Sequence, residues 1–263
     1  MQINFYKYQG TANDFILIDN RSNMIQTLSN KQIAQWCHRR LGIGADGLML
    51  LQHKEGYDFE MVYYNADGNI SSMCGNGGRC ITEFANHLGM LPTGKARFWA
   101  IDGEHQAVVS ALNYVQLQMK DVSHIDQQKN YTLLDTGSPH YISFVSTRTP
   151  INIVEEGSAI RYSPLFAAEG VNVNFVMQHA DGTLEVATYE RGVEDETWSC
   201  GTGVTASAIA YHAAQMPTEQ SVEIVVKTKG GQLQVNFDYQ DGVYSNIWLC
   251  GPALLVFEGI INL

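Results

Sequence analysis

Two stretches of the sequence decide the fold: NADGNISSMCGNGGRC at residues 65–80 and YERGVEDETWSCGTG at residues 189–203. In each stretch a β-like run ends, a turn follows, and a Cys-Gly-x-Gly motif opens a helix-like segment. A pattern that returns after a long interval indicates an internal structural repeat. The chain is therefore expected to form two similar halves, each with one cysteine, Cys74 or Cys200, at the start of a helix.

The rest of the sequence supports a repeat built mainly from strands. Asn13–Leu17 is echoed by Asn172–Val176, which extends the similarity upstream of each motif. Helical periodicity predicts three helices, at residues 30–40, 78–88 and 202–214. Alternating or short apolar runs predict strands at residues 15–19, 48–52, 59–64, 107–110, 114–119, 172–177, 184–189, 221–226, 232–237 and 243–249.

Composition excludes several classes of function. The 263 residues include 16 Lys and Arg against 27 Asp and Glu, a formal net charge of -11, which disfavours nucleic acids and anionic membranes as partners. No long apolar run opens the chain, so neither a signal peptide nor a membrane span is expected and a cytoplasmic location is favoured. The five cysteines are an odd number with no zinc-ligand spacing, so reduced thiols and no metal site are expected.

A cysteine at the start of a helix is suited to proton transfer. The first backbone N–H groups of a helix have no partner within the helix and carry partial positive charge, so they bind carboxylates and stabilise a neighbouring thiolate. The glycines that follow the cysteine permit close approach of a ligand to the backbone. A thiol pKa near 8.5 is lowered in such a position, which makes the group an acid or base near neutral pH.

Two such cysteines on matched halves indicate a two-base reaction. Inverting a stereocentre next to a carboxylate requires that a proton leave one face of the carbon and another arrive at the opposite face. Without an electron sink, the developing carbanion needs backbone N–H groups directed at the substrate carboxylate and a site closed to water.

Both motifs, together with Gly10–Phe15, Gly42–Gly47, Gly137–His140 and Gly170–Phe175, resemble the diaminopimelate epimerase family over nearly the whole chain. The resemblance implies epimerisation of LL-2,6-diaminoheptanedioate to the meso form in lysine and peptidoglycan precursor synthesis, without pyridoxal phosphate or another cofactor. It also implies a homodimer and the following site: Cys74 and Cys200 as the acid/base pair; Asn13, Asn65, Gly75, Asn76, Asn172, Glu190, Arg191, Gly201 and Thr202 as substrate contacts; and His140 and Glu190 as residues that tune the thiol pKa values.

The chain departs from the common family pattern at two places. Ser138 stands where many members of the family have Asn, so a shorter hydroxyl or a water replaces one expected hydrogen bond. The stretch Val193–Glu196, which contains Glu194 and Asp195, is one residue longer than the commoner form, so a different path of the loop before Cys200 is expected.

Four alternative interpretations are weaker. Gly42–Gly47 matches a dinucleotide-binding fingerprint, but it follows a helix-like segment and precedes an apolar run, so it is interpreted as a turn. Proline racemases and hydroxyproline epimerases usually have His at the position of Asn76, and Arg191 favours a second substrate carboxylate. A phenazine-pathway isomerase would lack the paired cysteines, and a noncatalytic amino-acid binding protein would not exchange the substrate α-hydrogen with solvent.

The predicted fold is therefore α+β, with two pseudo-symmetric domains, each a curved, mainly antiparallel, barrel-like sheet around a central helix. The curvature and the central helix are what the family resemblance implies, and the strand-rich texture agrees with them. The first domain is expected to cover residues 1–121, completed by 251–263, and the second residues 122–250. The substrate is expected in a cleft between the halves.

Overall fold

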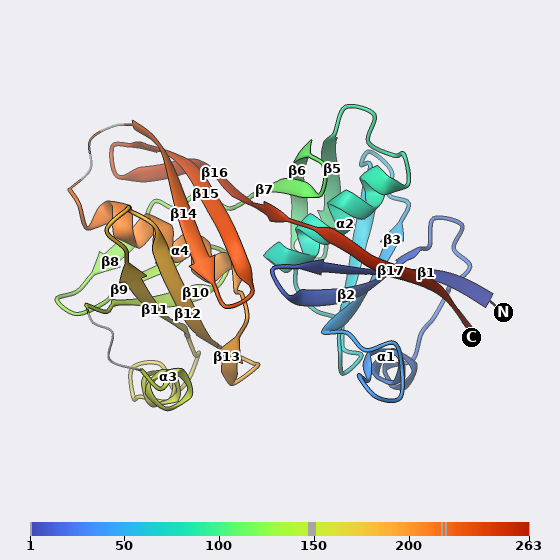
Figure 1. Ribbon diagram of the computed structural model, residues 1–263, viewed down its shortest axis with the longest axis horizontal. Helices are drawn as coiled ribbons and strands as arrows, with labels where there is room; N and C mark the ends of the chain where they lie inside the picture. The colour runs from blue at the N-terminus through green and yellow to red at the C-terminus, as the bar shows by residue number, and fades with distance from the viewer. Residues whose placement is uncertain (1, 147–150, 217, 219, 263) are drawn as a thin grey trace. The chain divides into compact units, whose positions relative to one another are not determined.

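A computed structural model describes residues 2–146, 151–216, 218 and 220–262. The chain divides into two compact units (Figure 1). Unit 1 consists of residues 1–117 and 251–263, and unit 2 of residues 118–250. The first boundary thus falls after Leu117, four residues before the predicted boundary after Asp121.

Unit 1 contains eight strands and two helices in its described part. Its sheet has the order β17-β1-β2-β3-β4-β5-β6-β7, in which β2–β3 and β4–β5 are parallel and the other neighbours antiparallel. The elements are β1 (Gln2–Gly10), β2 (Asn13–Asp19), α1 (Asn30–Cys37), β3 (Gly47–Gln52), β4 (Phe59–Asn65), α2 (Gly75–His87), β5 (Lys95–Ala100), β6 (Gly103–Ala111), β7 (Tyr114–Gln118) and β17 (Leu254–Asn262).

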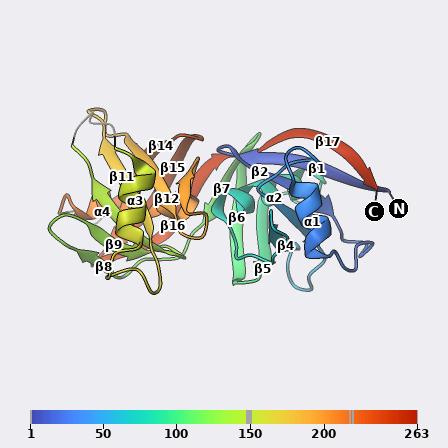
Figure 2. The same cartoon turned by 90° about the horizontal axis from the view of Figure 1, so that it is seen from below.

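Helix α2 lies inside the curve of this sheet, and α1 lies outside it (Figures 1 and 2). Every residue from Gly75 to Ala85 is buried, and the helix packs against β1, β2, β3, β6 and β17. A helix buried on all sides needs small residues where neighbours approach: a Cβ at Gly77 would lie 2.2 Å from the Cε of Met49. On the outer face, α1 buries Ile33 and Trp36 against the sheet.

Unit 2 repeats this arrangement. Its sheet has the order β8-β9-β10-β11-β12-β14-β15-β16, and the short β13 pairs with β12. Helix α4 packs against strands β9 to β12, β14 and β15 and is buried along most of its length, while α3 packs on β11, β12 and β13. The elements are β8 (Ile125–Gln127), β9 (Thr132–Asp135), β10 (Pro139–Phe144), α3 (Ile153–Arg161), β11 (Asn172–Gln178), β12 (Leu184–Glu190), β13 (Asp195–Thr197), α4 (Gly201–Ala213), β14 (Gln220–Thr228), β15 (Gly231–Gln240) and β16 (Val243–Pro252).

The strand pairings confirm an internal repeat but correct one of its correspondences. Parallel pairs β2–β3 and β10–β11 each precede an antiparallel pair, β3–β4 and β11–β12, and then a parallel one, β4–β5 and β12–β14. Strand β11 therefore corresponds to β3. The proposed echo between Asn13–Leu17 and Asn172–Val176 was wrong, because these segments occupy non-equivalent strands; the resemblance arose because both are apolar strands that begin with Asn.

Several elements differ from the sequence-based predictions. Helices α2 and α4 begin directly after the cysteines, at Gly75 and Gly201, one to three residues earlier than predicted. The strands β1, β5, β8, β9, β10, β13 and β17 and the helix α3 were not predicted. Helix α3 carries Gly157 in its middle, which weakens the helical signal; a Cβ there would lie 2.4 Å from the Cβ of Tyr189. No helix in the described part of the chain is long and apolar enough to cross a membrane.

Candidate active site

Cys74 and Cys200 occupy the same position in the two units. Each is the N-cap residue of a 13-residue central helix, in an extended conformation, with φ/ψ of -112°/131° at Cys74 and -111°/109° at Cys200. In neither case does the side chain cap the helix by a hydrogen bond. Each thiol therefore lies next to N–H groups of a first helical turn, which carry partial positive charge.

In unit 1 the structure brings Asn13 and Asn76 together with Cys74. The Cys74 thiol donates to Oδ1 of Asn13 at 3.6 Å, and Nδ2 of Asn76 donates to the same oxygen at 3.3 Å. Asn13 follows a two-residue turn in which Thr11 and Ala12 have φ of 51° and 65°. This is the left-handed turn that matches the twist of a hairpin, here between β1 and β2.

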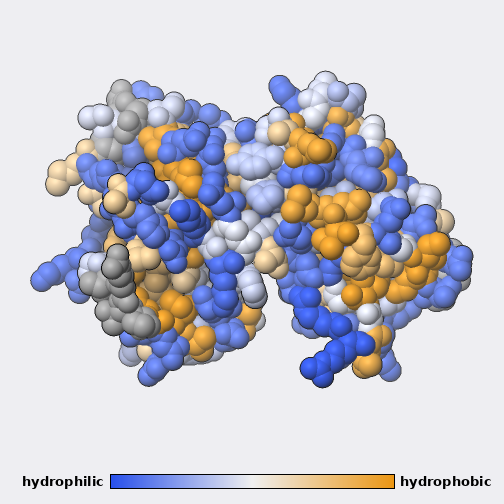
Figure 3. Space-filling model, viewed as in Figure 1, coloured by the Kyte–Doolittle hydropathy of each residue, from blue (hydrophilic) through white to orange (hydrophobic). Residues whose placement is uncertain are grey.

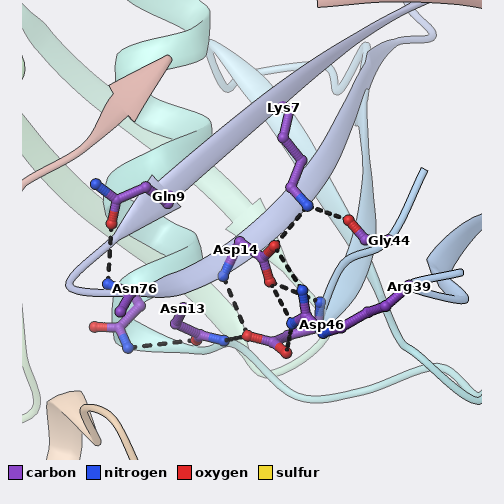
Figure 4. Close-up of polar contacts among 9 residues, drawn as sticks. Lys7, Gln9, Asn13, Asp14, Arg39, Gly44, Asp46 and Asn76 are labelled. Atoms are coloured by element: carbon purple, nitrogen blue, oxygen red, sulfur yellow. Dashed lines mark hydrogen bonds and ion pairs between the residues drawn. The ribbon is translucent and has the colours of Figure 1, made fainter. Parts of the chain in front are cut away.

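A network of charged side chains holds the other side of Asn13 (Figure 4). Nδ2 of Asn13 donates to Asp46 at 2.6 Å, and Arg39 bridges Asp46 and Asp14 at 2.6 and 2.8 Å. Lys7 pairs with Asp14 at 2.5 Å and donates to the Gly44 carbonyl. Burial raises the pKa of Asp14, but hydrogen bonds from Arg39 and Lys7 outweigh that effect and hold it at about 2.

The side-chain oxygen of Asn76 accepts a hydrogen bond from Arg79, which is fully buried. Nη2 of Arg79 donates to Oδ1 of Asn76 at 3.0 Å and to the Thr11 hydroxyl at 3.3 Å, and Nη1 donates to the Gly75 carbonyl at 3.3 Å. Arg79 therefore joins the first turn of α2 to the β1–β2 hairpin.

The remaining predicted residue of unit 1, Asn65, lies at the exposed end of β4. Its backbone closes a turn with Gly68 and Asn69, at 2.9 Å in each case. The structure thus places Asn65 in a surface turn, and its role in substrate binding remains a prediction. Cys37 and Cys80 are buried thiols whose pKa burial raises to about 12, so they are inert near neutral pH.

In unit 2 the thiol of Cys200 lies 3.5 Å from the Thr202 hydroxyl, and either group can donate. The Thr202 carbonyl accepts from the Thr136 hydroxyl at 2.9 Å. Cys200 is buried, with 7% of its surface exposed.

Asn172, Ser138 and Arg191 form a second cluster. Nδ2 of Asn172 donates to the Ser138 hydroxyl at 2.8 Å, and its Oδ1 accepts from the Arg191 backbone at 2.9 Å. The Arg191 guanidinium reaches Ser138 at 3.5 Å and the Glu169 carbonyl at 2.9 Å. The exposed guanidinium keeps donors available for a carboxylate.

His140 lies in the interior of unit 2 beneath the start of α4. Its Nδ1 is 3.0 Å from Nδ2 of Asn174, which must donate, so the imidazole proton resides on Nε2. Oδ1 of Asn174 accepts from the Thr188 hydroxyl at 2.9 Å, and a Cβ at Gly203 would lie 2.4 Å from that oxygen. Desolvation, with a contribution from the charge of Arg191, lowers the pKa of His140 to about 3, so the ring is neutral at pH 7.

The loop before Cys200 forms a small hairpin. Glu190 ends β12, lies opposite Asp195 of β13, and accepts through its carbonyl from the Glu194 backbone at 2.8 Å. The Glu194 carboxylate accepts from the Tyr189 hydroxyl at 3.0 Å and from the Gly192 backbone at 3.1 Å. These bonds fix the path of the stretch that the sequence analysis singled out as longer.

Sequence reasoning missed the residues that orient the site. Asp46 lies in Gly42–Gly47 and Asn174 in Gly170–Phe175, two segments that were quoted as family matches without a role for either residue. Each is a single polar residue with nonpolar neighbours, Asp46 just before β3 and Asn174 inside β11, and such a signal is weak in a single sequence. The space at Gly77 and Gly203 is occupied by Met49 and Asn174, so these two glycines serve helix packing rather than ligand approach. Within the described ranges, no group of three His, Cys, Asp or Glu side chains is arranged to hold a metal ion.

Comparison with known proteins places this geometry in a family. The sequence model of diaminopimelate epimerase matches residues 5–123 and 132–254, which include both helix starts. The chain belongs to the diaminopimelate epimerase family. It is 48% identical to the diaminopimelate epimerase of Flavobacterium psychrophilum over 256 residues, covering 97% of this chain and 99% of that one. The diaminopimelate epimerase of Chlorobaculum tepidum is 42% identical over 260 residues, with coverage of 97% and 99%.

Solved structures with the same fold are distant in sequence. A phenazine biosynthesis protein of the PhzF family from Bacillus anthracis superposes with a TM-score of 0.78 at 13% identity, covering all of both chains. A hydroxyproline epimerase from Agrobacterium vitis superposes with a TM-score of 0.71 at 14% identity, covering 99% of this chain and 92% of that one. At this identity they support the α+β fold of the diaminopimelate epimerase family and not a particular substrate.

Proposed function

We propose that this member of the diaminopimelate epimerase family is an isomerase that converts LL-2,6-diaminoheptanedioate to the meso form, in lysine and peptidoglycan precursor synthesis. The observation that supports a two-thiol mechanism most directly is the equivalence of Cys74 and Cys200, each the N-cap of a buried central helix. The family relatives carry the assignment of the substrate.

In the proposed reaction one cysteine, as thiolate, takes the α-proton from one face of the carbon. The other cysteine, as thiol, delivers its proton to the opposite face, so the two residues exchange protonation states and the net charge is unchanged. The electron pair that the departing proton leaves is delocalised into the adjacent carboxylate, which the first-turn N–H groups stabilise. Both proton transfers are supplied by the chain, so the mechanism needs no cofactor.

The substrate contacts that we propose fall into two groups. In unit 1 they are Asn13, Asn65, Gly75 and Asn76. In unit 2 they are Asn172, Glu190, Arg191, Gly201 and Thr202. The Arg191 guanidinium has the chemistry to bind the distal carboxylate of a dicarboxylate substrate, and Ser138 holds the neighbouring amide of Asn172.

His140 and Glu190 are the residues that we propose to tune the thiol pKa values. His140 is neutral at neutral pH, and its Nδ1 accepts from Asn174. It would therefore act as a neutral dipole close to the start of α4 rather than as an imidazolium.

An assay with LL- and meso-diaminopimelate in deuterated water tests the function. The expected result is interconversion, with one solvent deuterium incorporated at the α-carbon of each product molecule. Activity should survive chelators and carbonyl reagents and be lost on thiol alkylation, with protection by substrate analogues. Efficient racemisation of proline, or saturable binding without any deuterium incorporation, would contradict the proposal.

A homodimer in the cytoplasm completes the proposal. Strand β17 exposes Leu254, Leu255, Val256, Phe257 and Ile260, between 37% and 62% of each side chain, and apolar residues gather on this face of unit 1 (Figure 3). In a chain of net charge -11, an apolar face is where a second copy meets the least repulsion. An odd number of cysteines in a chain of 263 residues agrees with a reducing compartment.

Light scattering coupled to gel filtration tests the dimer. The wild type should have the mass of two chains, and Val256→Lys should shift it to one chain. Val243→Lys, at an exposed apolar residue in unit 2, is the matched control and should leave the mass unchanged. A monomeric wild type would contradict the homodimer.

A further inference from the structure

Two amide side chains near Cys74 form a chain of hydrogen bonds whose ends are fixed by charge. At one end Asp46, as a carboxylate, only accepts; at the other end Arg79, as a guanidinium, only donates. Between them, Arg79 donates to Oδ1 of Asn76 at 3.0 Å, and Nδ2 of Asn76 donates to Oδ1 of Asn13 at 3.3 Å. Nδ2 of Asn13 then donates to Asp46 at 2.6 Å (Figure 4).

This order leaves one orientation for each amide. Rotating the Asn13 amide by half a turn would point its oxygen at the Asp46 carboxylate and its NH2 at the NH2 of Asn76, which replaces two hydrogen bonds by two repulsive contacts. Arg79 prevents Asn76 from turning with it. Oδ1 of Asn13 is therefore held toward Cys74, whose thiol donates to it at 3.6 Å.

An acceptor beside a thiol favours the protonated form, because it binds S–H and repels a thiolate. The first turn of α2 acts in the opposite direction. We propose that Asp46 is a positioning residue that, through the amide of Asn13, keeps Cys74 in its thiol form in the resting protein.

Other charged groups lie on the elements packed around the start of α2, and their effect must be separated from this one. They are Lys7 and Asp14 in the β1–β2 hairpin, Arg39 and Asp46 between α1 and β3, Arg79 and Glu83 on α2, Asp102 in the β5–β6 turn and its partner His105 in β6. Neutralising Asp46 removes one negative charge from this set, which by itself favours a thiolate at Cys74. A test must distinguish that direct effect from the effect that passes through Asn13.

The consequence for catalysis rests on the proposed function. If Cys74 holds its proton at rest, Cys200 is the resting base, and its neighbouring Thr202 hydroxyl is able to donate to a thiolate. The resting protein is then prepared for the stereoisomer whose α-hydrogen faces Cys200.

The experiment measures the pH midpoint of iodoacetamide alkylation at Cys74, followed in the Cys74 peptide by mass spectrometry in the full-length protein. Asp46→Asn should lower the midpoint by about one unit, because two or three hydrogen-bond donors lower a carboxylate pKa by about two units. Asn13→Ala should lower it as well. Asp19→Asn, which loses an exposed ion pair to Arg21 at the far end of β2, is the matched control and should not change it.

The double variant Asn13→Ala/Asp46→Asn decides between the two effects. If Asp46 acts through Asn13, the second substitution adds no further shift. A shift of the same size in both backgrounds would show a direct charge effect and overturn the proposal, as would an unchanged or raised midpoint in Asp46→Asn. Asp46→Ser, with a smaller side chain, replaces Asp46→Asn in the same cycle if circular dichroism shows that Asp46→Asn does not fold.

The measurement needs no turnover, so the two proposals fail separately. Loss of the predicted midpoint shift with normal epimerisation would overturn the role of Asp46 alone. The predicted shift in a protein that does not epimerise diaminopimelate would overturn the proposed function and leave the role of Asp46 intact.

Discussion

The start of α2 and the start of α4 share a backbone but differ in their polar surroundings. Both helices have 13 residues. Each has a cysteine in an extended conformation as its N-cap residue, and the side chain of that cysteine makes no capping hydrogen bond. At α2 the nearby amides lie between a carboxylate and a guanidinium, whereas at α4 hydrogen bonds join neutral groups of Thr202, Thr136, Asn174 and His140. The repeat thus gives the two cysteines the same backbone position, while the side chains hydrogen-bonded around them differ between the units.

Exchanging one thiol for a hydroxyl should have the largest effect on this pair. Cys74→Ser and Cys200→Ser should each lower epimerisation at least about 100-fold, because a hydroxyl is a far weaker acid and base at neutral pH. Each variant should still exchange the α-hydrogen of the stereoisomer that faces its remaining thiol, LL in one variant and meso in the other. Near wild-type activity in either variant would rule out the two-thiol mechanism, and equal exchange of both stereoisomers would mean that the thiols do not serve opposite faces.

The next largest effect should come from the one arginine that unit 2 contributes to the proposed substrate contacts. Arg191→Ala should cost about 2–4 kcal/mol of transition-state stabilisation, measured as kcat/KM with diaminopimelate, because a charge-assisted contact to the distal carboxylate is lost. Arg97→Ala is the matched control, since Arg97 is also an exposed arginine that donates to a backbone carbonyl, that of Gly56. An unchanged kcat/KM in Arg191→Ala would remove this residue from the substrate site.

Equivalent glycines in the two helices should respond differently to alanine. Gly203→Ala should destabilise the protein by about 1–3 kcal/mol through overpacking, because the new Cβ meets Oδ1 of Asn174, which is held by the Thr188 hydroxyl. Gly77→Ala should cost less than about 1 kcal/mol, because the end of the flexible Met49 side chain can move and Ala favours a helix over Gly by about 1 kcal/mol. Thermal unfolding of both variants measures the difference, and equal losses would show that Asn174 is not rigid.

A pH-dependent loss of stability should also appear in acid. His140 has a folded pKa of about 3, below the 6.5 of a free histidine, so the unfolded state binds more protons and stability falls as the pH drops from 6.5 toward 3. Asp14, with a pKa of about 2 against 3.8, loses its contribution only below about pH 4.

Urea unfolding at several pH values measures these contributions. His140→Asn should flatten the dependence between pH 6.5 and 4, while His124→Asn, at an exposed histidine, should not. Asp14→Asn should lower stability at pH 7 and have no further effect at pH 2. The same pH dependence in wild type and His140→Asn would mean that the buried ring is protonated in the folded protein.

The sequence was sufficient for the features that repeat and insufficient for the features that depend on tertiary contacts. Cys-Gly-x-Gly after a strand predicted both helix starts, because a motif of glycines and a turn is local. Strand β17 was missed because it pairs with β1 from the opposite end of the chain. Pairing partners, and not an alternating pattern, define such strands.

The same distinction holds within the candidate site. Cys74, Asn13 and Asn76 were predicted by resemblance, and the structure brings them within hydrogen-bonding distance of one another. Asp46 and Arg79 were not assigned a function, because the order of donors and acceptors that gives them one exists only when the β1–β2 hairpin, the α1–β3 loop and α2 come together. A single sequence does not contain that order.

The turn at Thr11 and Ala12 sets folding stability against the catalytic rate of the proposed reaction. Two consecutive non-glycine residues with positive φ cost roughly 1 kcal/mol or more each, so glycine at Ala12 would relieve strain and make the folded state more stable. The same glycine would let the hairpin flex where Asn13 begins β2. Directed evolution for thermostability should therefore select glycine at residue 12. Directed evolution for catalytic rate should retain a non-glycine residue there, so the two selections should give different residues in this turn.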